Sequence, residues 1–411
     1  MDRTNFAHST SFLRLGAMAT STRTTESANP GVTPATGLES SAAADGDAEG
    51  NEDLGAAFSL RDTRQILNGL FEHKPWIYWT DFILTTSLAY ACALVYLWAP
   101  WTAVGVAMKV VTFFIAGFAM FRTATMIHEI VHMRKGLMPG FRAAWNIFFG
   151  IPLMMPSLLY SNHFDHHRRH HYGTEHDGEY HPFARRSPWK FVTYFGQALV
   201  LPIFAVFRAL VLAPLSWFHP PLRHWVLARF SSYGSNFSYR RELSKNEPYI
   251  LWTLVEIGCF LSLMGLAVRI HDGMPLVRLV QIYLLSVFTI GLNWVRNLAG
   301  HRFRNEGGTL SALGQLEDSV TIDGNPITTE LLFPIGLRYH ALHHLYPSLP
   351  YHSLGTAHRR LLAQLPADSL YHRTIFPSFT ACMRQLWSES CAAARASRDS
   401  QLPNQSALSG S

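Results

Sequence analysis

The sequence contains little charge. Only 15% of its 411 residues are Asp, Glu, Lys or Arg, whereas a soluble globular protein carries about 25%. Hydrophobic residues make up 48% and aromatic residues 13%, a combination typical of a chain that lies in a lipid bilayer. The net charge of +6 predicts contact with anionic lipid headgroups and no nucleic acid, because the arginines lie beside apolar runs and form no separate basic face.

Cysteine is also scarce, and its positions exclude several classes of site. The four cysteines are scattered, at Cys92, Cys259, Cys382 and Cys391. No CxxC pair is present, so the sequence predicts no zinc ribbon, no iron–sulfur cluster and no disulfide framework.

Residues 1–56 lack a long apolar run. They are rich in Ser, Thr, Ala and Gly, so they cannot bury enough apolar surface to offset the entropy lost on ordering. They also lack the apolar core of a signal peptide. We expect a disordered N-terminal tail at 1–56, a membrane-bound domain at 57–380 and a C-terminal tail at 381–411.

Long apolar runs begin after this tail. A membrane helix needs about 20 apolar residues, and four runs meet that length clearly: 77–98, 101–121, 249–268 and 276–295. The links within each pair are short, which predicts two helical hairpins. Tryptophans border the first run, as in the aromatic belts at membrane interfaces.

Two further runs, 141–160 and 191–217, are ambiguous because both contain interior prolines. A single crossing by 141–160 would put His128 and His163 on opposite sides, so we allow these runs to lie in the interface or to re-enter. The arginine-rich stretches then share one side, which the positive-inside rule makes cytoplasmic. The predicted fold is an all-α integral membrane protein with four transmembrane helices in two hairpins and a cytoplasmic histidine-rich helical cap.

Histidine is abundant, and most of it occurs in clusters. The 21 histidines include an HExxH sequence, "HEIVH", and two HxxHH sequences, "HFDHH" and "HALHH". The spacings i, i+3 and i+4 put side chains on one helical face, and three remote repeats of this kind have no packing explanation. The clustered residues are His128 and His132; His163, His166 and His167; and His340, His343 and His344, with Asn297 and His301 four apart after the last apolar run.

These clusters predict metal binding. About nine histidines exceed the four ligands of one zinc ion, so two ions are the natural number. Imidazole suits iron, copper or zinc, and paired iron is the usual solution where oxygen is activated beside a hydrocarbon. The second box overlaps another HxxHH triple formed by His167, His170 and His171, so His170 and His171 stay open as alternative ligands.

The three boxes, in this order and around four spans, resemble the membrane-bound fatty acid desaturase superfamily. The "HHLYPSLPYHSL" that ends the third box is similar to the family's "HHLxPxxPxxxL", and the resemblance covers about residues 60–365. It implies a non-haem di-iron centre on the cytoplasmic side, with O2 as co-substrate and a fatty acyl chain as substrate. The implied ligands are His128, His132, His163, His166, His167, His301, His340, His343 and His344, with His170, His171 and Asn297 as additional or alternative ligands.

The resemblance implies oxidation of an unactivated C–H bond, with desaturation first. Hydroxylation of an acyl chain or hydrocarbon, and oxidative decarboxylation to a terminal alkene, are the alternatives within the superfamily. The sequence lacks an HPGG haem-binding motif and a cysteine cluster, so we expect a separate electron donor of the ferredoxin or cytochrome b5 type, docked on exposed arginines such as Arg168, Arg169, Arg302 and Arg304.

An enzyme of another class, an intramembrane HExxH zinc protease, would use His128, His132 and Glu129. It would leave the other seven histidines of the set without a role.

Overall fold

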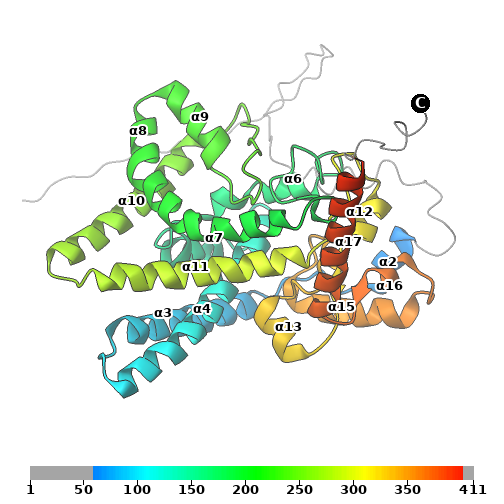
Figure 1. Ribbon diagram of the computed structural model, residues 1–411, viewed down its shortest axis with the longest axis horizontal. Coiled ribbons are helices and arrows are strands. Elements are labelled where there is room, and N and C mark those ends of the chain that lie inside the picture. The colour runs from blue at the N-terminus through cyan, green and yellow to red at the C-terminus, as the bar shows by residue number, and fades with distance from the viewer. Residues whose placement is uncertain (1–58, 401–411) are drawn as a thin grey trace, which may run out of the picture. The chain divides into compact units, whose positions relative to one another are not determined.

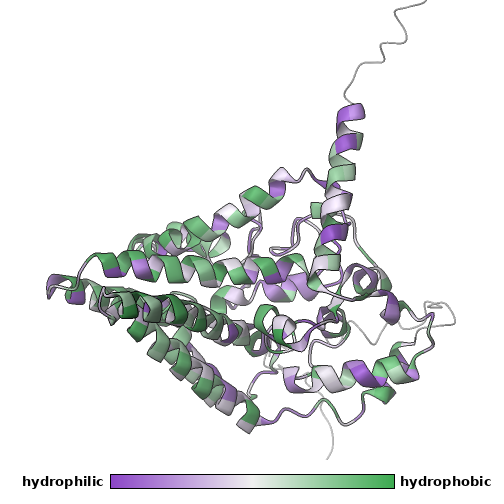
Figure 2. Ribbon diagram, turned by 60° about the horizontal axis from the view of Figure 1, so that its bottom comes forward, coloured by the Kyte–Doolittle hydropathy of each residue, from purple (hydrophilic) through white to green (hydrophobic). Residues whose placement is uncertain are grey.

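The computed structural model describes residues 59–400, so the tail predicted at 1–56 lies outside the described residues. Within them, five helical segments are long and apolar enough to cross a membrane, by length and composition. Hydrophobic residues dominate these long helices (Figure 2). They are α3 (Pro75–Trp98), α4 (Ala103–His132), the segment Trp189–Trp217, α10 (Tyr249–His271) and α11 (Val277–Leu298).

Helices α3 and α4 form an antiparallel pair. The link between them is tight, since a Cβ on Gly105 would lie 1.9 Å from the carbonyl oxygen of Pro100. Beside it, Lys109 Nζ donates to the carbonyl oxygen of Tyr96 at 2.8 Å, which ties the start of α4 to the end of α3. The pair places the C-terminal turn of α4, with His128 and His132, next to the start of α3.

The predicted second pair is arranged differently. Helices α10 and α11 are consecutive, but they diverge from the turn that joins them (Figure 1). Helix α11 packs against α4 and α7, whereas α10 packs against η4 and α8. A Cβ on Gly117 of α4 would lie 2.3 Å from the ring of Phe288 on α11, so the glycine permits the close approach of these two helices.

The fifth long segment contains a π-helical turn. It consists of α7 (Trp189–Phe207), the π-helical turn η4 (Arg208–Leu212) and α8 (Ala213–Trp217), and it is followed by α9 (Pro220–Phe230). After α9 the chain returns to α7 and to Leu159. Gln197 Nε2 of α7 donates to the carbonyl oxygen of Ser235 at 3.0 Å, and the Tyr233 amide donates to the Leu159 carbonyl at 2.8 Å.

A buried ionic cluster holds this segment to α10. Glu256 is 1% exposed and accepts hydrogen bonds from Arg208 at 2.7 Å, from Arg223 at 2.5 Å and from the Trp217 indole at 3.0 Å. A carboxylate with two guanidinium partners is the arrangement that lets a charge remain buried among apolar helices.

The run 141–160 forms no membrane-length helix. It folds into α5 (Pro139–Trp145), the π-helical turn η1 (Asn146–Gly150) and the 3-10 turn η2 (Ser157–Tyr160). None of these pieces approaches the roughly 20 residues of a span. The end of α4 and the start of α6 (His163–His167) therefore stay close together.

The remaining elements are short, apart from α15 and α17. Their bounds are α2 (Leu60–Ile66), η3 (Phe183–Arg185), α12 (Ala312–Asp318), α13 (Pro326–Leu332), α14 (His340–Leu345), α15 (Tyr351–Gln364), α16 (Leu370–Arg373) and α17 (Phe379–Asp399), with a parallel pair of two-residue strands, β1 (Thr321–Ile322) and β2 (Ile375–Phe376). The predicted boundary at residue 380 falls inside α17, whose residues Cys382, Leu386 and Ser390 are buried.

Candidate metal centre

Nine histidines converge in two adjacent groups at one end of the long helices. Within each group, one nitrogen per ring lies within 4.8 Å of the chosen nitrogen of every other ring. The larger group contains His128, His132, His163, His167 and His343, and the smaller group contains His166, His301, His340 and His344. These nine residues are the nine implied by the resemblance, and the structure brings all of them together.

The two HxxHH helices each contribute to both groups. In α6, His163 and His167 are four residues apart and enter the larger group, whereas His166 points to the smaller one. In α14, the pair His340 and His344 enters the smaller group and His343 the larger. The i, i+4 pair and the i+3 residue of one short helix therefore serve two different sites.

The spacing of the ring nitrogens fits a metal ion. In the smaller group, the Nε2 atom of His301 lies 3.0 Å from those of His166 and His340. In the larger group, the Nε2 atom of His167 lies 3.0 Å from that of His163 and 3.1 Å from that of His343. Two nitrogens bound at about 2.1 Å to one ion lie about 3.0 Å apart at a right angle and about 3.4 Å apart at a tetrahedral angle. The spacing is therefore short enough for the rings of each group to share one metal ion.

Unpaired buried nitrogens support the same conclusion. Neither ring nitrogen of His128 has a hydrogen-bond partner in the described structure, and Nε2 of His132 has none. A buried polar atom without a partner costs about 1–3 kcal/mol, and a metal ion would satisfy these atoms. Burial also lowers the pKa of His163, His167 and His343 well below the usual value, so the rings are neutral, which is the form that binds metal.

Carboxylates orient two of the rings. Nδ1 of His166 donates to Asp177 at 2.9 Å, and Nδ1 of His163 donates to Glu179 at 2.9 Å. Although burial lowers the pKa of His166, the Asp177 carboxylate raises it above its ordinary value overall. Burial raises the pKa of Glu179 to about 7. A carboxylate that holds Nδ1–H leaves Nε2 free for a metal and makes the ring a better ligand.

A tyrosine holds the ring of His301, and this residue was missed from the sequence. Nδ1 of His301 donates to the Tyr172 hydroxyl at 2.7 Å, and that hydroxyl donates to Asp318 at 2.8 Å. Tyr180 also donates to Asp318, at 2.9 Å. Tyr172 lies outside the three histidine boxes, and no spacing signal connects a residue at 172 to one at 301.

The alternative second-box residues lie outside both groups. His170 is exposed, and Nδ1 of His171 lies 3.2 Å from the carboxylate of Asp165. The structure therefore brings together the first HxxHH triple and not the overlapping one. The Asn297 side chain lies on the last turn of α11, near Tyr194.

Glu129 does not lie in the position of a protease general base. Its carboxylate accepts the Tyr78 hydroxyl at 2.7 Å and the Tyr351 backbone amide at 3.2 Å. The HExxH glutamate therefore links α4 to α3 and to the start of α15, which does not favour the zinc protease interpretation.

Three of the arginines expected to face a donor are engaged within the protein. Arg302 donates to the carbonyl oxygens of Glu317 and Arg373. Arg304 forms a two-bond ion pair with Glu389, and Arg168 pairs with Asp165 at 2.8 Å.

Comparison with known proteins agrees with this site. Residues 105–376 match the family described as fatty acid desaturase, so the chain belongs to that family, as its histidine boxes predicted. It is similar to a ceramide hydroxylase of Caulobacter vibrioides (strain NA1000 / CB15N), with 33% identity over 330 residues that cover 80% of this chain and 92% of the relative. The chain is a membrane oxidoreductase that uses oxygen to oxidise a C–H bond of a fatty acyl chain, by desaturation or hydroxylation.

Proposed function

We propose that this enzyme hydroxylates a ceramide-type lipid rather than desaturating a fatty acid. The observation that carries the proposal is the similarity to a ceramide hydroxylase over 92% of that protein's length. The sequence favoured desaturation on its motif tail and four-span spacing, whereas the similarity to a hydroxylase favours oxygen insertion. Whether hydrogen loss or oxygen insertion follows the first C–H cleavage depends on the placement of the chain at the site.

The proposed cofactor is a pair of iron ions, one in each histidine group. The nine histidines of the two groups would hold them, and bound iron would supply the oxygen activation needed to break an unactivated C–H bond. The protein's own contribution is positional. Asp177, Glu179 and Tyr172 fix three rings so that Nε2 faces the centre, and the burial of these rings excludes bulk water from the reaction.

We propose four membrane spans, formed by α3, α4, α10 and α11, with the histidine groups on the cytoplasmic side. The chain that follows the segment Trp189–Trp217 returns to α7, where that segment begins, and to the chain just before α6. Helix α9 has 11 residues, or about 16 Å at 1.5 Å per residue, which is too short to recross a hydrocarbon core of about 30 Å. This segment therefore re-enters or lies in the interface. The arginines near the histidine groups support the cytoplasmic orientation through the positive-inside rule.

The reaction also needs electrons from outside the lipid. Hydroxylation consumes one O2, two electrons and two protons, inserts one oxygen atom into the C–H bond and releases the other as water. The sequence has no HPGG motif and no cysteine cluster, so we propose a separate one-electron donor of the ferredoxin or cytochrome b5 type.

Lipid mass spectrometry of an expressing host tests the proposal. We expect a ceramide 16 mass units heavier and about two irons per purified chain. A lipid two units lighter would show a desaturase instead. His343→Ala should abolish the product, because His343 lies in the larger group. His170→Ala removes an exposed ring outside both groups and should leave the product unchanged. Full activity of His343→Ala would refute the site.

A further inference from the structure

The route by which electrons enter can be located on the protein surface. We propose that the groove between α17 and the chain around η3 is the docking surface for an acidic electron-donor protein. This inference rests on the proposed function, because only an oxidation that consumes external electrons needs such a partner. Three observations support it: the groove itself, its proximity to His301, and its charge.

The groove is open and of substantial size. It has a volume of about 480 Å³ and is lined on one side by Ala184, Arg185 and Arg304 and on the other by residues 389–396 of α17. The α17 wall is made of Ala392, Ala393 and Ala396 beyond Glu389. The hydroxyl of Ser390 donates to the carbonyl oxygen of Arg186, which fixes the helix against η3. A wall of alanines leaves room for side chains from a partner.

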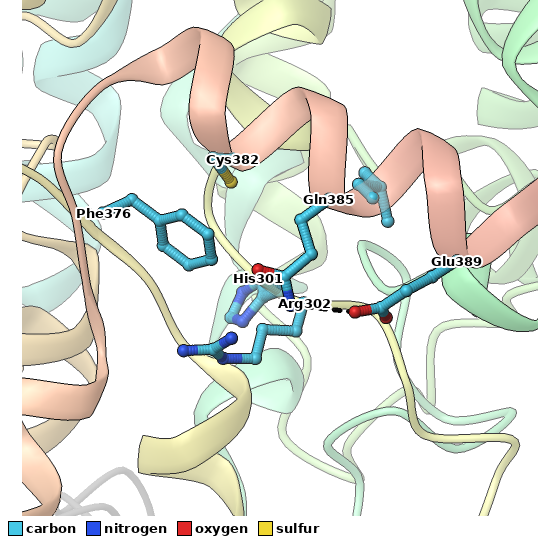
Figure 3. Close-up of a pocket in the computed structure, with 7 residues that line it drawn as sticks. His301, Arg302, Phe376, Cys382, Gln385 and Glu389 are labelled. Carbon is cyan, nitrogen blue, oxygen red and sulfur yellow. Dashed lines mark hydrogen bonds between the residues drawn. The ribbon is translucent and has the colours of Figure 1, made fainter.

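The same helix continues from the groove to a second cavity, whose lining includes a residue of the metal centre. Figure 3 shows a smaller cavity whose lining includes His301, Cys382 and Glu389. Glu389 lines both cavities, so the groove adjoins the smaller cavity at Glu389, and the lining of that cavity includes His301. His301 belongs to the smaller histidine group. A donor held in the groove would thus lie close to a residue of the centre.

The charge of the groove fits an acidic partner. Glu389 is the one acidic residue among those that line it, and its carboxylate is neutralised by the ion pair with Arg304. Arg185, which lines the groove, is exposed. The next residue, Arg186, is also exposed, as is Lys190 further along the chain. The groove therefore carries net positive charge. Complementary charge at a rim mainly speeds association and makes it depend on salt.

An anionic lipid headgroup is the other ligand whose charge suits this groove. Exposed tryptophans lie nearby: Trp189 is 73% exposed and Trp387 is 54% exposed, and interfacial tryptophan is common beside lipid headgroups. Proximity to His301 favours the donor, because a bound headgroup gains nothing from that position. The experiment distinguishes the two.

The test is a charge reversal, Arg185→Glu with Arg186→Glu, in the full-length purified enzyme. The matched control is Arg269→Glu, an exposed arginine at the far end of α10. The donors are a purified [2Fe–2S] ferredoxin and a purified cytochrome b5, each with its reductase. We expect the apparent KM for the donor to rise about tenfold at low ionic strength, the salt dependence to flatten, and the Kd from a direct binding titration to rise equally. The control should match the wild type.

Single turnover after chemical reduction with dithionite separates docking from chemistry. We expect the double variant to give wild-type product in this assay and to retain its iron. An unchanged KM and Kd in the double variant would overturn the proposal. The proposal would also fail if the wild-type enzyme turned over with dithionite but with neither of the two acidic donors. Loss of binding to anionic vesicles at unchanged donor KM would assign the groove to lipid. If the wild type forms no hydroxylated lipid even with dithionite, the proposed function fails, and the binding titration still tests the groove.

Discussion

Asp177 offers the sharpest test of how the protein holds its metal ligands. The carboxylate is fully buried and accepts four hydrogen bonds. One oxygen accepts from His166 Nδ1 and from the Gly173 amide, both at 2.9 Å. The other accepts from the Glu179 amide at 2.8 Å and from the Tyr180 amide at 3.2 Å. Each of these four hydrogen-bond partners is an N–H donor.

Asp177→Asn keeps the shape but places an amide NH2 against two donors, whichever way the side chain turns. In one orientation the NH2 faces Nδ1 of His166, and the ring loses its acceptor. In the other orientation the NH2 faces the amides of Glu179 and Tyr180, and the loop that contains residue 177 is no longer held in place. Changes of this kind in the groups that orient metal ligands typically reduce metal affinity about 10- to 100-fold, which corresponds to about 1.4–2.7 kcal/mol. We expect iron affinity to fall by that amount, measured by competition with a chelator of known affinity.

Asp165→Asn is the matched control for this variant. Its carboxylate lies in the same box but contacts Arg168, His171 and Tyr239, none of which belongs to the histidine groups. Its iron affinity should stay within about twofold of the wild type, in contrast to the loss expected from a ligand-orienting group. Equal affinities for the two variants would refute the role assigned to Asp177.

Three further predictions follow from charge and burial. Glu256→Gln leaves two buried guanidiniums without a counter-charge and should destabilise the fold by about 3–5 kcal/mol. Glu330→Gln breaks a half-exposed ion pair and should cost under about 1 kcal/mol. Thermal unfolding in detergent measures both variants, and similar shifts in their melting temperatures would contradict the argument from burial. Tyr172→Phe removes the acceptor for Nδ1 of His301 and should lower iron affinity without unfolding the protein. Competition with a chelator measures this affinity, and an unchanged value would contradict the role of Tyr172. Burial lowers the pKa of His358 to about 4, so the contribution of the neutral ring to stability is complete above the ordinary pKa of 6.5 and is lost as the pH falls towards 4. Between pH 7.5 and 5.5 the loss is about 1 kcal/mol. The unfolding free energy of His358→Gln should therefore depend less on pH over that interval than that of the wild type, and equal pH dependence would show that the ring is freely solvated.

The histidine boxes could be predicted from the sequence because their spacing is local. An i, i+3, i+4 pattern determines which side chains share a face of one helix, and all nine predicted residues converge. The division into two groups could not be predicted, since it depends on how α6 and α14 face each other across some 175 residues of sequence. For the same reason, the sequence left open which of the two overlapping HxxHH triples binds metal, the one that begins at His163 or the one that ends at His171.

Helix α17 shows a different limit. Residues 381–399 are rich in Ala, Ser and Arg, a composition that gave no sign of a buried face. Only three of its side chains, at positions 382, 386 and 390, are buried, and their i, i+4 spacing is too sparse to stand out from a solvated helix or a tail. The contacts that settle its position, such as Arg304 with Glu389, join residues 85 apart.

The interleaving of the two histidine groups has a consequence for how the centre forms. Helices α6 and α14 each supply rings to both groups, whereas α4 supplies only the larger one and His301 only the smaller one. A helix of five or six residues is unstable alone, so α6 and α14 depend on their neighbours for their orientation. Displacement of either helix therefore disturbs both groups at once. Loss of His128 directly removes a ring from one group, because α4 is a long helix fixed independently by its packing on α3 and α11.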